Sequence, residues 1–220
     1  IPDVKDCKKQ YVHTGDDKVQ MWEWYSGSST LSATMATDDV SHMPPIDYRY
    51  GWNLSKPQHQ QLLLDRLITV GTLFAAPNCS PWGNNSRATP QPTRDQRRQE
   101  EKPTLLFLAV ACFFQILLNR RYVVESCGYS DIYDDSPLNT LRKLQYHMAL
   151  LDQCACGGTL EGMPIRKRTH FQSNHPIHHL EVRCPGNHVH LNLRGKGRTA
   201  SAAQYPIGEC KRIIAEGVAP

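Results

Sequence analysis

The feature that most constrains the fold is an uncharged, largely apolar run at residues 67–76 that stops abruptly at Pro77. Its β-branched residues predict a buried strand, and Pro77, Pro81 and Gly83 predict an irregular loop after it. The loop carries Cys79 at the carboxyl end of the strand, the edge where open α/β sheets bind ligands. A packed thiol without chemistry is the alternative, because free cysteines are usually small buried hydrophobes.

The segments that precede this run alternate between strand and helix patterns. In order, they predict a strand at 19–25, a helix at 31–37, a strand at 42–46, a helix at 56–66 and the strand of residues 67–76. This order predicts an α/β domain with a mostly parallel, doubly wound sheet. The first helix is expected to take Ser28, Ser29 or Thr30 as its N-cap.

The turn between the first strand and the first helix consists of small residues, with Gly27 near its start. Small side chains let a ligand approach the backbone, and a helix N-terminus offers unpaired N–H groups. Asp47 lies about 20 residues further on, where nucleotide sites hydrogen-bond a ribose, and Asn53 is expected on the same rim. One glycine is not a GxGxxG motif, so an ordinary capped turn is the alternative.

The rest of the chain predicts a polar arm at the start and further α/β elements after the cysteine loop. The arm covers residues 1–18, and residues 19–217 form the domain. Within the domain we expect a flexible loop at 84–101 and a mostly buried helix from Lys102 to about Arg120. The later elements are a strand at 121–125, a helix at 138–151, a strand at 153–156 and a closing helix at 205–216. The strand at 121–125 brings the carboxyl of Glu125 to the same sheet edge as Cys79.

Charge is distributed unevenly along the chain. After residue 162 there are nine Lys and Arg against three Asp and Glu, whereas residues 1–162 carry sixteen against eighteen. A basic C-terminal part can follow a phosphate backbone, although a solvated surface is the alternative. The candidate nucleic-acid contacts are Arg87, Arg94, Lys167, Arg194 and Lys196.

The cysteines and apolar runs indicate the compartment. Eight cysteines show no disulfide-scaffold spacing, and no charged-then-apolar leader opens the chain. The longest apolar run, residues 105–118, is too short to span a bilayer. We therefore expect an intracellular protein that is neither secreted nor bound to a membrane.

A histidine-rich segment raises the question of a metal. Cys184, His188 and His190 form a Cys-x3-His-x-His pattern, which is not a recognised closed zinc spacing. Cys154 and Cys156 add only a weak Cys-x-Cys pair. The sequence therefore predicts no metal and a strand pair with hydrogen-bonded histidines, with zinc as the alternative.

Taken in order, several motifs resemble those of the cytosine-5 DNA methyltransferases, over residues 19–217. The stretch with Tyr25, Ser26, Gly27 and Ser28 is similar to the motif that binds S-adenosylmethionine. Pro77-Asn78-Cys79 is similar to the Pro-Cys nucleophile motif, and Glu125-Ser126-Cys127 is similar to the Glu-Asn-Val motif. Residues 166–169 resemble the family's basic motif, and residues 205–215 resemble its closing helix. Within that family, the residues of these motifs are most similar to those of divergent members in phages and in mobile-element polyproteins.

The resemblance implies a Rossmann-like class I methyltransferase that uses S-adenosylmethionine and acts on DNA, in a chain that belongs with other domains of a larger polyprotein. It implies Cys79 as nucleophile and Glu125 as acid, with Arg166 or Arg168 holding the base carbonyl or favouring the thiolate. It also implies that the cofactor is bound by the Tyr25–Ser28 turn together with Asp47, Asn53 and Pro77.

Departures from the family pattern support other functions. Ser126 replaces the family's asparagine, Ser28 and Ser29 stand where a second glycine is expected, and Asn53 replaces an acid. Residues 175–203 leave room only for a reduced target-recognition segment. The alternatives are a catalytically impaired remnant that binds nucleic acid, and a methyltransferase for another substrate.

Overall fold

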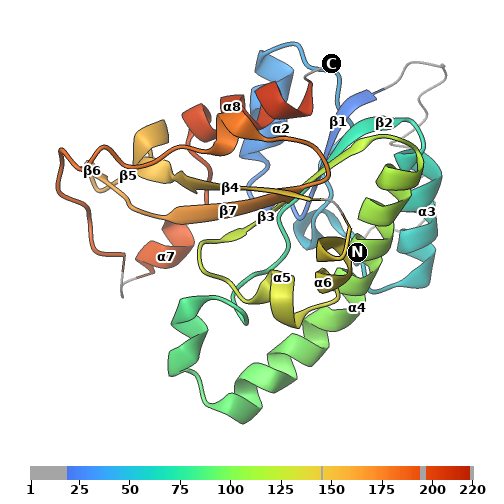
Figure 1. Ribbon diagram of the computed structural model, residues 1–220, viewed down its shortest axis with the longest axis horizontal. Helices are drawn as coiled ribbons and strands as arrows, with labels where there is room; N and C mark the ends of the chain where they lie inside the picture. Colours follow the sequence, from blue (N-terminus) through green and yellow to red (C-terminus); the bar gives the residue numbers. More distant parts are fainter. Residues whose placement is uncertain (1–18, 145, 194–196, 219–220) are drawn as a thin grey trace.

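The computed structural model describes residues 19–144, 146–193 and 197–218. They form a mixed α/β fold around a five-stranded, mainly parallel sheet in the order β1-β2-β3-β7-β4 (Figure 1). The strands are β1 (Val19–Trp24), β2 (Val70–Ala75), β3 (Arg121–Cys127), β4 (His147–Asp152) and β7 (Arg168–Ser173). Strands β1, β2 and β3 pair in parallel, and β7 runs antiparallel to both β3 and β4. Four strands therefore share one direction.

Helices cover both faces of this sheet (Figure 1). Helices α2 (Thr30–Thr37) and α8 (Ile207–Gly217) pack on one face, and α3 (Pro57–Leu67) and α4 (Gln91–Leu117) pack on the other. The remaining elements are η1 (Tyr48–Tyr50), η2 (Asn84–Ala88), α5 (Ile132–Asp135), α6 (Asn139–Arg142), η3 (Gln153–Cys156), β5 (Thr159–Leu160), β6 (Met163–Pro164), η4 (His178–Leu180) and α7 (Arg198–Ser201).

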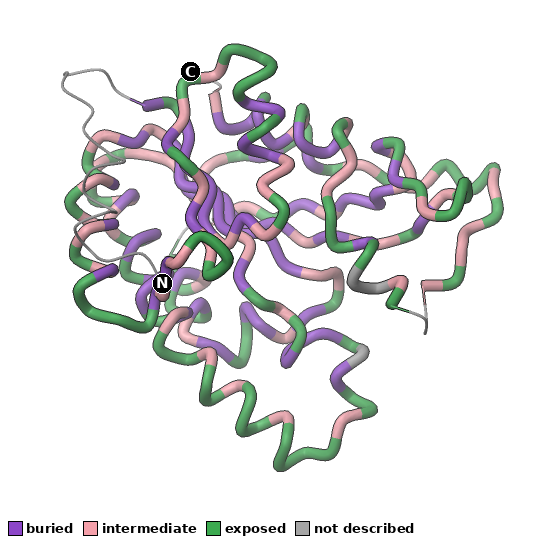
Figure 2. The backbone as a smooth tube through the Cα atoms, turned by 180° about the vertical axis from the view of Figure 1, so that it is seen from behind, coloured by how far each residue is buried: buried purple, intermediate pink, exposed green. Residues whose placement is uncertain are grey.

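Alternation along the strands separates two hydrophobic cores. Trp22 and Trp24 of β1 belong to the core beneath α3 and α4, whereas Met21 belongs to the core beneath α2 and α8. The buried strands form the centre of the molecule in Figure 2. Both faces are covered, which explains why β2 reads as an uncharged, largely apolar run.

The segment expected as a flexible loop at 84–101 is helical instead. It contains η2 and the first part of α4, and Pro103 lies inside the helix rather than at its start. Pro92 occupies the first turn, where a missing N–H has no consequence, and Gln, Arg and Glu are good helix formers. The helix is also less buried than expected, since Leu106 and Leu117 are exposed.

Four further expectations about secondary structure are wrong. The strand predicted at 42–46 forms only isolated bridges to β1, at His42 and Ile46. The helix predicted at 138–151 is replaced by the short α6 and by β4, because pairing with β7 decides the state of an ambiguous apolar run. Residues 153–156 form the 3-10 helix η3 instead of a strand. Within the described part of residues 184–193 there is no strand pair, only irregular backbone.

The N-terminus of α2 is capped in an unexpected way. Ser29 takes the N-cap position with φ 55° and makes no side-chain cap bond. Glu23, a buried residue of β1, accepts from the backbone N–H of Ser32 at 2.9 Å and from the Ser32 hydroxyl. Burial raises the pKa of Glu23 to about 7. A side chain from the neighbouring strand therefore replaces the local serine cap.

The described helices include none that is long and apolar enough to cross a membrane. The predicted arm at 1–18 lies outside the described residues, as do Arg194 and Lys196.

The closing helix α8 depends on a glycine in its first turn. A Cβ at Gly208 would lie 2.5 Å from the backbone oxygen of Cys156, which cannot move as a side-chain tip can. Gly208→Ala is therefore expected to lower the free energy of unfolding by about 1–3 kcal/mol in urea denaturation. Ile207→Ala, at an exposed neighbour, is the control and should stay within about 0.5 kcal/mol. Equal stability of Gly208→Ala and the parent chain would contradict this packing.

Candidate active site

A cavity of about 420 Å³ lies at the carboxyl ends of β1, β2 and β3. Residues 42–46 form parallel bridges to one side of β1, at Met21 and Trp24, while β2 pairs with its other side. The two segments that follow β1 in the chain therefore lie on opposite sides of it. Open α/β sheets bind ligands at the carboxyl ends of strands at such a point. The lining residues are Tyr25, Ser26, Gly27, Ser28, Arg49, Ala76, Pro77, Asn78, Cys79, Glu125, Lys167, Ser201, Ala203, Gln204 and Tyr205.

The turn after β1 forms one wall of this cavity, as the sequence predicts. Tyr25 and Gly27 both have positive φ, 57° and 54°. The Tyr25 hydroxyl donates to the Thr104 carbonyl at 3.0 Å, which ties the turn to α4. A Cβ at Gly27 would meet nothing within 4 Å, so the backbone there is open to a ligand.

Asp47 holds this turn from behind. Its Oδ2 accepts the Gly27 N–H at 2.8 Å and its Oδ1 accepts the Arg49 N–H at 2.9 Å. Gly27 and Arg49 line the cavity, whereas Asp47 is not among the described lining residues. The structure therefore places Asp47 as a support of the turn.

Asn53 does not reach the cavity. Its side-chain oxygen accepts from the N–H and the hydroxyl of Ser55, at 3.0 and 2.6 Å, which closes a local turn. Its backbone N–H donates to His59 Nδ1 at 3.0 Å. These short-range bonds explain why Asn53, expected on the rim, faces its own loop.

Removal of the Asp47 carboxylate should destabilise the turn. Asp47→Ala leaves the N–H groups of Gly27 and Arg49 without their acceptor, so the free energy of unfolding should fall by about 1–3 kcal/mol. Urea denaturation measures this loss. Asp65→Ala, at an exposed position of α3, is the matched control, and equal stabilities of the two variants would contradict the supporting role.

The loop after β2 brings Cys79 to the cavity in a half-buried position. The Cys79 carbonyl accepts from the N–H groups of Trp82 and Gly83, both at 3.0 Å, which fixes the turn. The Cys79 Sγ accepts from the Cys127 N–H at 3.4 Å. The side-chain hydrogen bond with Cys127 and burial raise the pKa of the Cys79 thiol, so it is protonated at neutral pH in the free chain.

Glu125 lies across the same cavity and is only 6% exposed. Burial raises the pKa of its carboxyl, while Lys167 and the Tyr205 hydroxyl oppose the rise. Ser126, the next residue of β3, is fully buried on the other side of the strand, and its hydroxyl has no partner among the described residues. Ser126 therefore cannot hold the carboxyl of Glu125.

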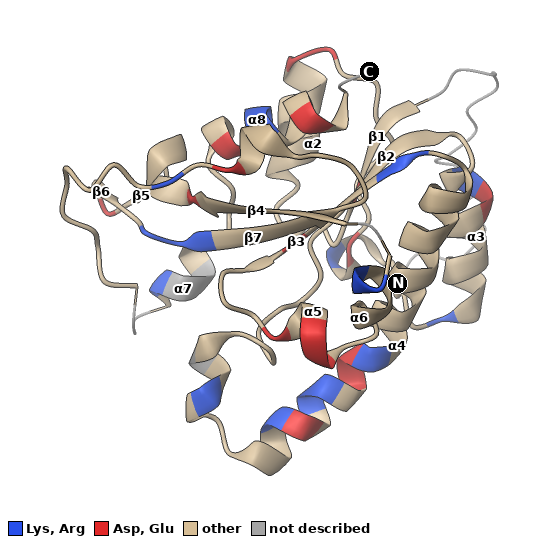
Figure 3. Cartoon of the chain, viewed as in Figure 1, with Lys and Arg blue, Asp and Glu red and all other residues tan. Residues whose placement is uncertain are grey.

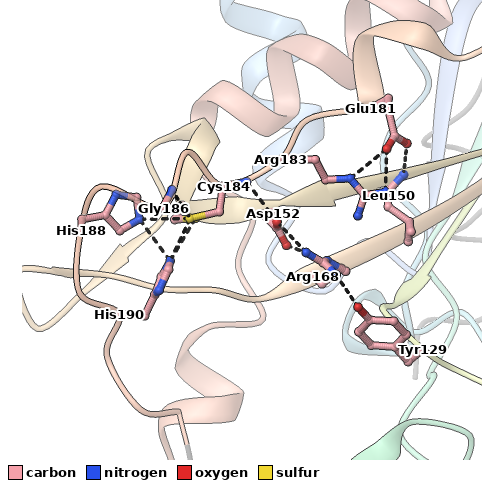
Figure 4. Close-up of polar contacts among 11 residues, drawn as sticks. Tyr129, Leu150, Asp152, Arg168, Glu181, Arg183, Cys184, Gly186, His188 and His190 are labelled. Atoms are coloured by element: carbon pink, nitrogen blue, oxygen red, sulfur yellow. Dashed lines mark hydrogen bonds and ion pairs between the residues drawn. The ribbon is translucent and has the colours of Figure 1, made fainter.

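Of the three consecutive basic residues 166–168, Lys167 lines the cavity and its two arginine neighbours do not. Arg166 is exposed, and Arg168 pairs with the buried Asp152 through two bonds of 2.8 Å and lies over the Tyr129 ring (Figure 4). Lys167 directly precedes β7, and Arg168 is the first residue of that strand. Arg166 and Arg168, expected at this site, therefore do not line the cavity, whereas Lys167 does.

Sequence reasoning missed several lining residues. Arg49 lies two positions after Asp47, and Asn78 stands inside the Pro77-Asn78-Cys79 motif, so closeness in sequence to predicted site residues is the signal for both. Gln204 and Tyr205 come from the segment before α8, more than 75 residues beyond Glu125 in the chain, and only tertiary packing brings them here.

The proposed nucleic-acid contacts remain predictions. Arg87 is exposed on η2, and Arg94 is half-buried on α4. Figure 3 shows Lys and Arg at the start of β7, on α7 and on η2, and shows both signs of charge alternating along the first half of α4. That half of α4 is not a purely basic surface.

Comparison with known proteins gives a distant match. No family model matches the chain, and no curated protein matches it. Among solved structures, the chain is similar to a mutant of DNMT2 from Spodoptera frugiperda, with a TM-score of 0.42 and 15% sequence identity. The match covers 75% of this chain and 55% of that chain, so this chain spans about half the length of that protein.

Proposed function

We propose that this chain is an S-adenosylmethionine-dependent methyltransferase domain that transfers a methyl group to carbon 5 of cytosine in DNA. The observation that carries the proposal is the placement of Cys79 and Glu125 on one cavity, together with the turn of Tyr25–Ser28. A thiol and a carboxyl on one cavity match the two groups that this reaction needs from a protein.

The cavity suits the cofactor. Its volume lies in the range of small-molecule sites, and Gly27 leaves its backbone open. Arg49 offers a cation for the amino-acid carboxylate, and the rings of Tyr25 and Tyr205 offer apolar surface. S-adenosylmethionine supplies an electrophilic methyl group when bound, and the chain's own residues must activate the base.

Cys79 would act as nucleophile. Its thiolate adds to carbon 6 of cytosine and converts the ring into an enamine whose carbon 5 can accept the methyl group. Loss of the carbon 5 proton to water, return of the ring-nitrogen proton to the Glu125 carboxylate and departure of the thiolate then restore the ring and the free enzyme. The Cys127 N–H favours the thiolate, against the Cys127 thiol contact and the burial that raise the pKa of Cys79.

Glu125 would act as acid. Thiolate addition places negative charge on the ring, and a protonated carboxyl bonded to the ring nitrogen neutralises it. Burial keeps the Glu125 carboxyl protonated to a higher pH than usual. The target base must leave the duplex stack to reach these groups, which costs a few kcal/mol.

The test is methylation of duplex DNA by the full chain with labelled S-adenosylmethionine, followed by mass spectrometry of the nucleosides. The proposal expects 5-methylcytosine in DNA that contains cytosine and no methylation of a duplex of A·T pairs alone. If no 5-methylcytosine forms when the cofactor and the DNA are both saturating, the result contradicts the proposal.

A catalytically impaired remnant that binds nucleic acid is the second candidate. The raised pKa of Cys79 and the burial of Ser126 away from Glu125 favour it. Calorimetry separates the two, since a remnant of this kind would bind DNA without measurable binding of S-adenosylmethionine.

A further inference from the structure

Four side chains outside the cavity converge on one point. Cys154 comes from η3, and Cys184, His188 and His190 come from the irregular segment after η4. One sulfur or nitrogen atom of each lies within 4.8 Å of the others, and all four residues are half-buried. The close-up in Figure 4 shows His188 and His190 turned towards the Cys184 sulfur.

Three of the four distances between neighbouring ligand atoms match the edges of a zinc tetrahedron, and the fourth is about 0.2 Å shorter. Zinc binds cysteine sulfur at about 2.3 Å and histidine nitrogen at about 2.0–2.1 Å, which requires ligand separations of about 3.3–3.8 Å. The Cys184 Sγ lies 3.7 Å from His188 Nε2 and 3.4 Å from His190 Nε2. The two Nε2 atoms are 3.1 Å apart, and His190 Nε2 lies 3.4 Å from the Cys154 Sγ.

We propose that Cys154, Cys184, His188 and His190 bind one zinc ion as a structural site. Two thiolates and two imidazoles form a recognised tetrahedral ligand set, and the thiolates balance the charge of Zn²⁺. Four protein ligands leave no open position, so this ion holds the fold and takes no part in the chemistry at Cys79.

The surrounding contacts fit metal ligation. The Gly186 N–H donates to the Cys184 Sγ at 3.3 Å, as suits a thiolate acceptor. His188 Nδ1 lies 3.0 Å from the Asn187 side-chain oxygen, and an oxygen there must accept. Nδ1 therefore carries the hydrogen and Nε2 presents its lone pair to the cluster.

The cluster is tied to the central sheet through Asp152, the last residue of β4. Asp152 Oδ2 accepts the Cys184 N–H at 3.0 Å, and the same carboxylate pairs with Arg168 of β7 (Figure 4). A zinc ion would join η3 to the segment that contains Cys184 and His190.

The sequence pattern alone does not predict this zinc site. The Cys-x3-His-x-His spacing supplies three ligands, and the fourth, Cys154, lies 30 residues earlier in the chain. Only the packing of η3 beside the later segment completes the set. The prediction that the region carries no metal rested on spacing, which does not show this contact.

The test measures metal in the full chain purified without chelators, by inductively coupled plasma mass spectrometry. We expect about one zinc ion per chain, and replacement by Co²⁺ should give the absorption of a tetrahedral, thiolate-ligated ion. Cys154→Ala and His190→Ala should weaken zinc binding by more than about 100-fold. Cys156→Ala and His178→Ala are the matched controls, because both residues lie close in sequence but outside the cluster.

Three results would overturn the proposal. They are a chain that neither contains zinc nor binds added Zn²⁺ or Co²⁺, zinc retained in both ligand variants, or a Cys154–Cys184 disulfide in the freshly purified protein. If the ligand variants fail to fold, the Co²⁺ spectrum of the parent chain and its loss on chelation still decide the question. Metal content does not depend on methyl transfer, so failure of one proposal leaves the other open.

Discussion

Cys79→Ser is expected to lower the rate of cytosine methylation by about 10⁴-fold or more while S-adenosylmethionine still binds. Serine keeps the size of the side chain but cannot form a comparable nucleophile in this cavity, where no histidine is among the described lining residues. Single-turnover assays measure the rate, and calorimetry checks the cofactor.

The matched control for Cys79→Ser is Cys112→Ser, at a buried position of α4 away from the cavity. It should retain the parent rate per folded molecule. A Cys79→Ser variant that methylates as fast as this control would assign the chemistry to another group, as a methyltransferase for a different substrate would require.

Glu125→Gln is expected to lower the methylation rate by about 10²–10⁴-fold, the usual contribution of general acid catalysis. Glutamine keeps the shape of the side chain and can still donate a hydrogen bond, but it has no acidic proton to give to the ring nitrogen. Glu100→Gln, at an exposed position of α4, is the control and should leave the rate unchanged. Equal rates for the two variants would remove Glu125 from the mechanism.

The pH dependence gives a second measure of the role of Glu125. Burial raises its pKa, so the protonated form persists above the usual carboxyl range and disappears as pH rises through the raised value. The parent rate divided by the Glu125→Gln rate should therefore fall with increasing pH. A ratio that rises with pH would identify Glu125 as a base.

Much of the fold could be predicted from local pattern. The strands β1, β2 and β3 and the helices α3 and α8 follow from apolar periodicity and from the prolines and glycines that end each element. The placement of Cys79 and Glu125 at one sheet edge follows from the same elements, because parallel strands end on the same side.

The remainder depends on contacts between distant parts of the chain. Pairing with β7 makes β4 a strand, and only the tertiary fold brings Lys167, rather than Arg166 or Arg168, to the cavity. The polar composition of residues 91–101 predicts a loop, yet these residues form the first part of α4, whose second part is the more buried. Cys154 joins its histidine partners only through tertiary packing.

Covalent trapping tests the central claim most directly. Duplex DNA that contains 5-fluorocytosine blocks release of the thiolate, because fluorine at carbon 5 cannot leave as a proton does. With saturating S-adenosylmethionine, we predict a stable protein–DNA adduct whose cross-linked peptide contains Cys79. Absence of an adduct under those conditions, or an adduct at any other residue, would contradict the assignment.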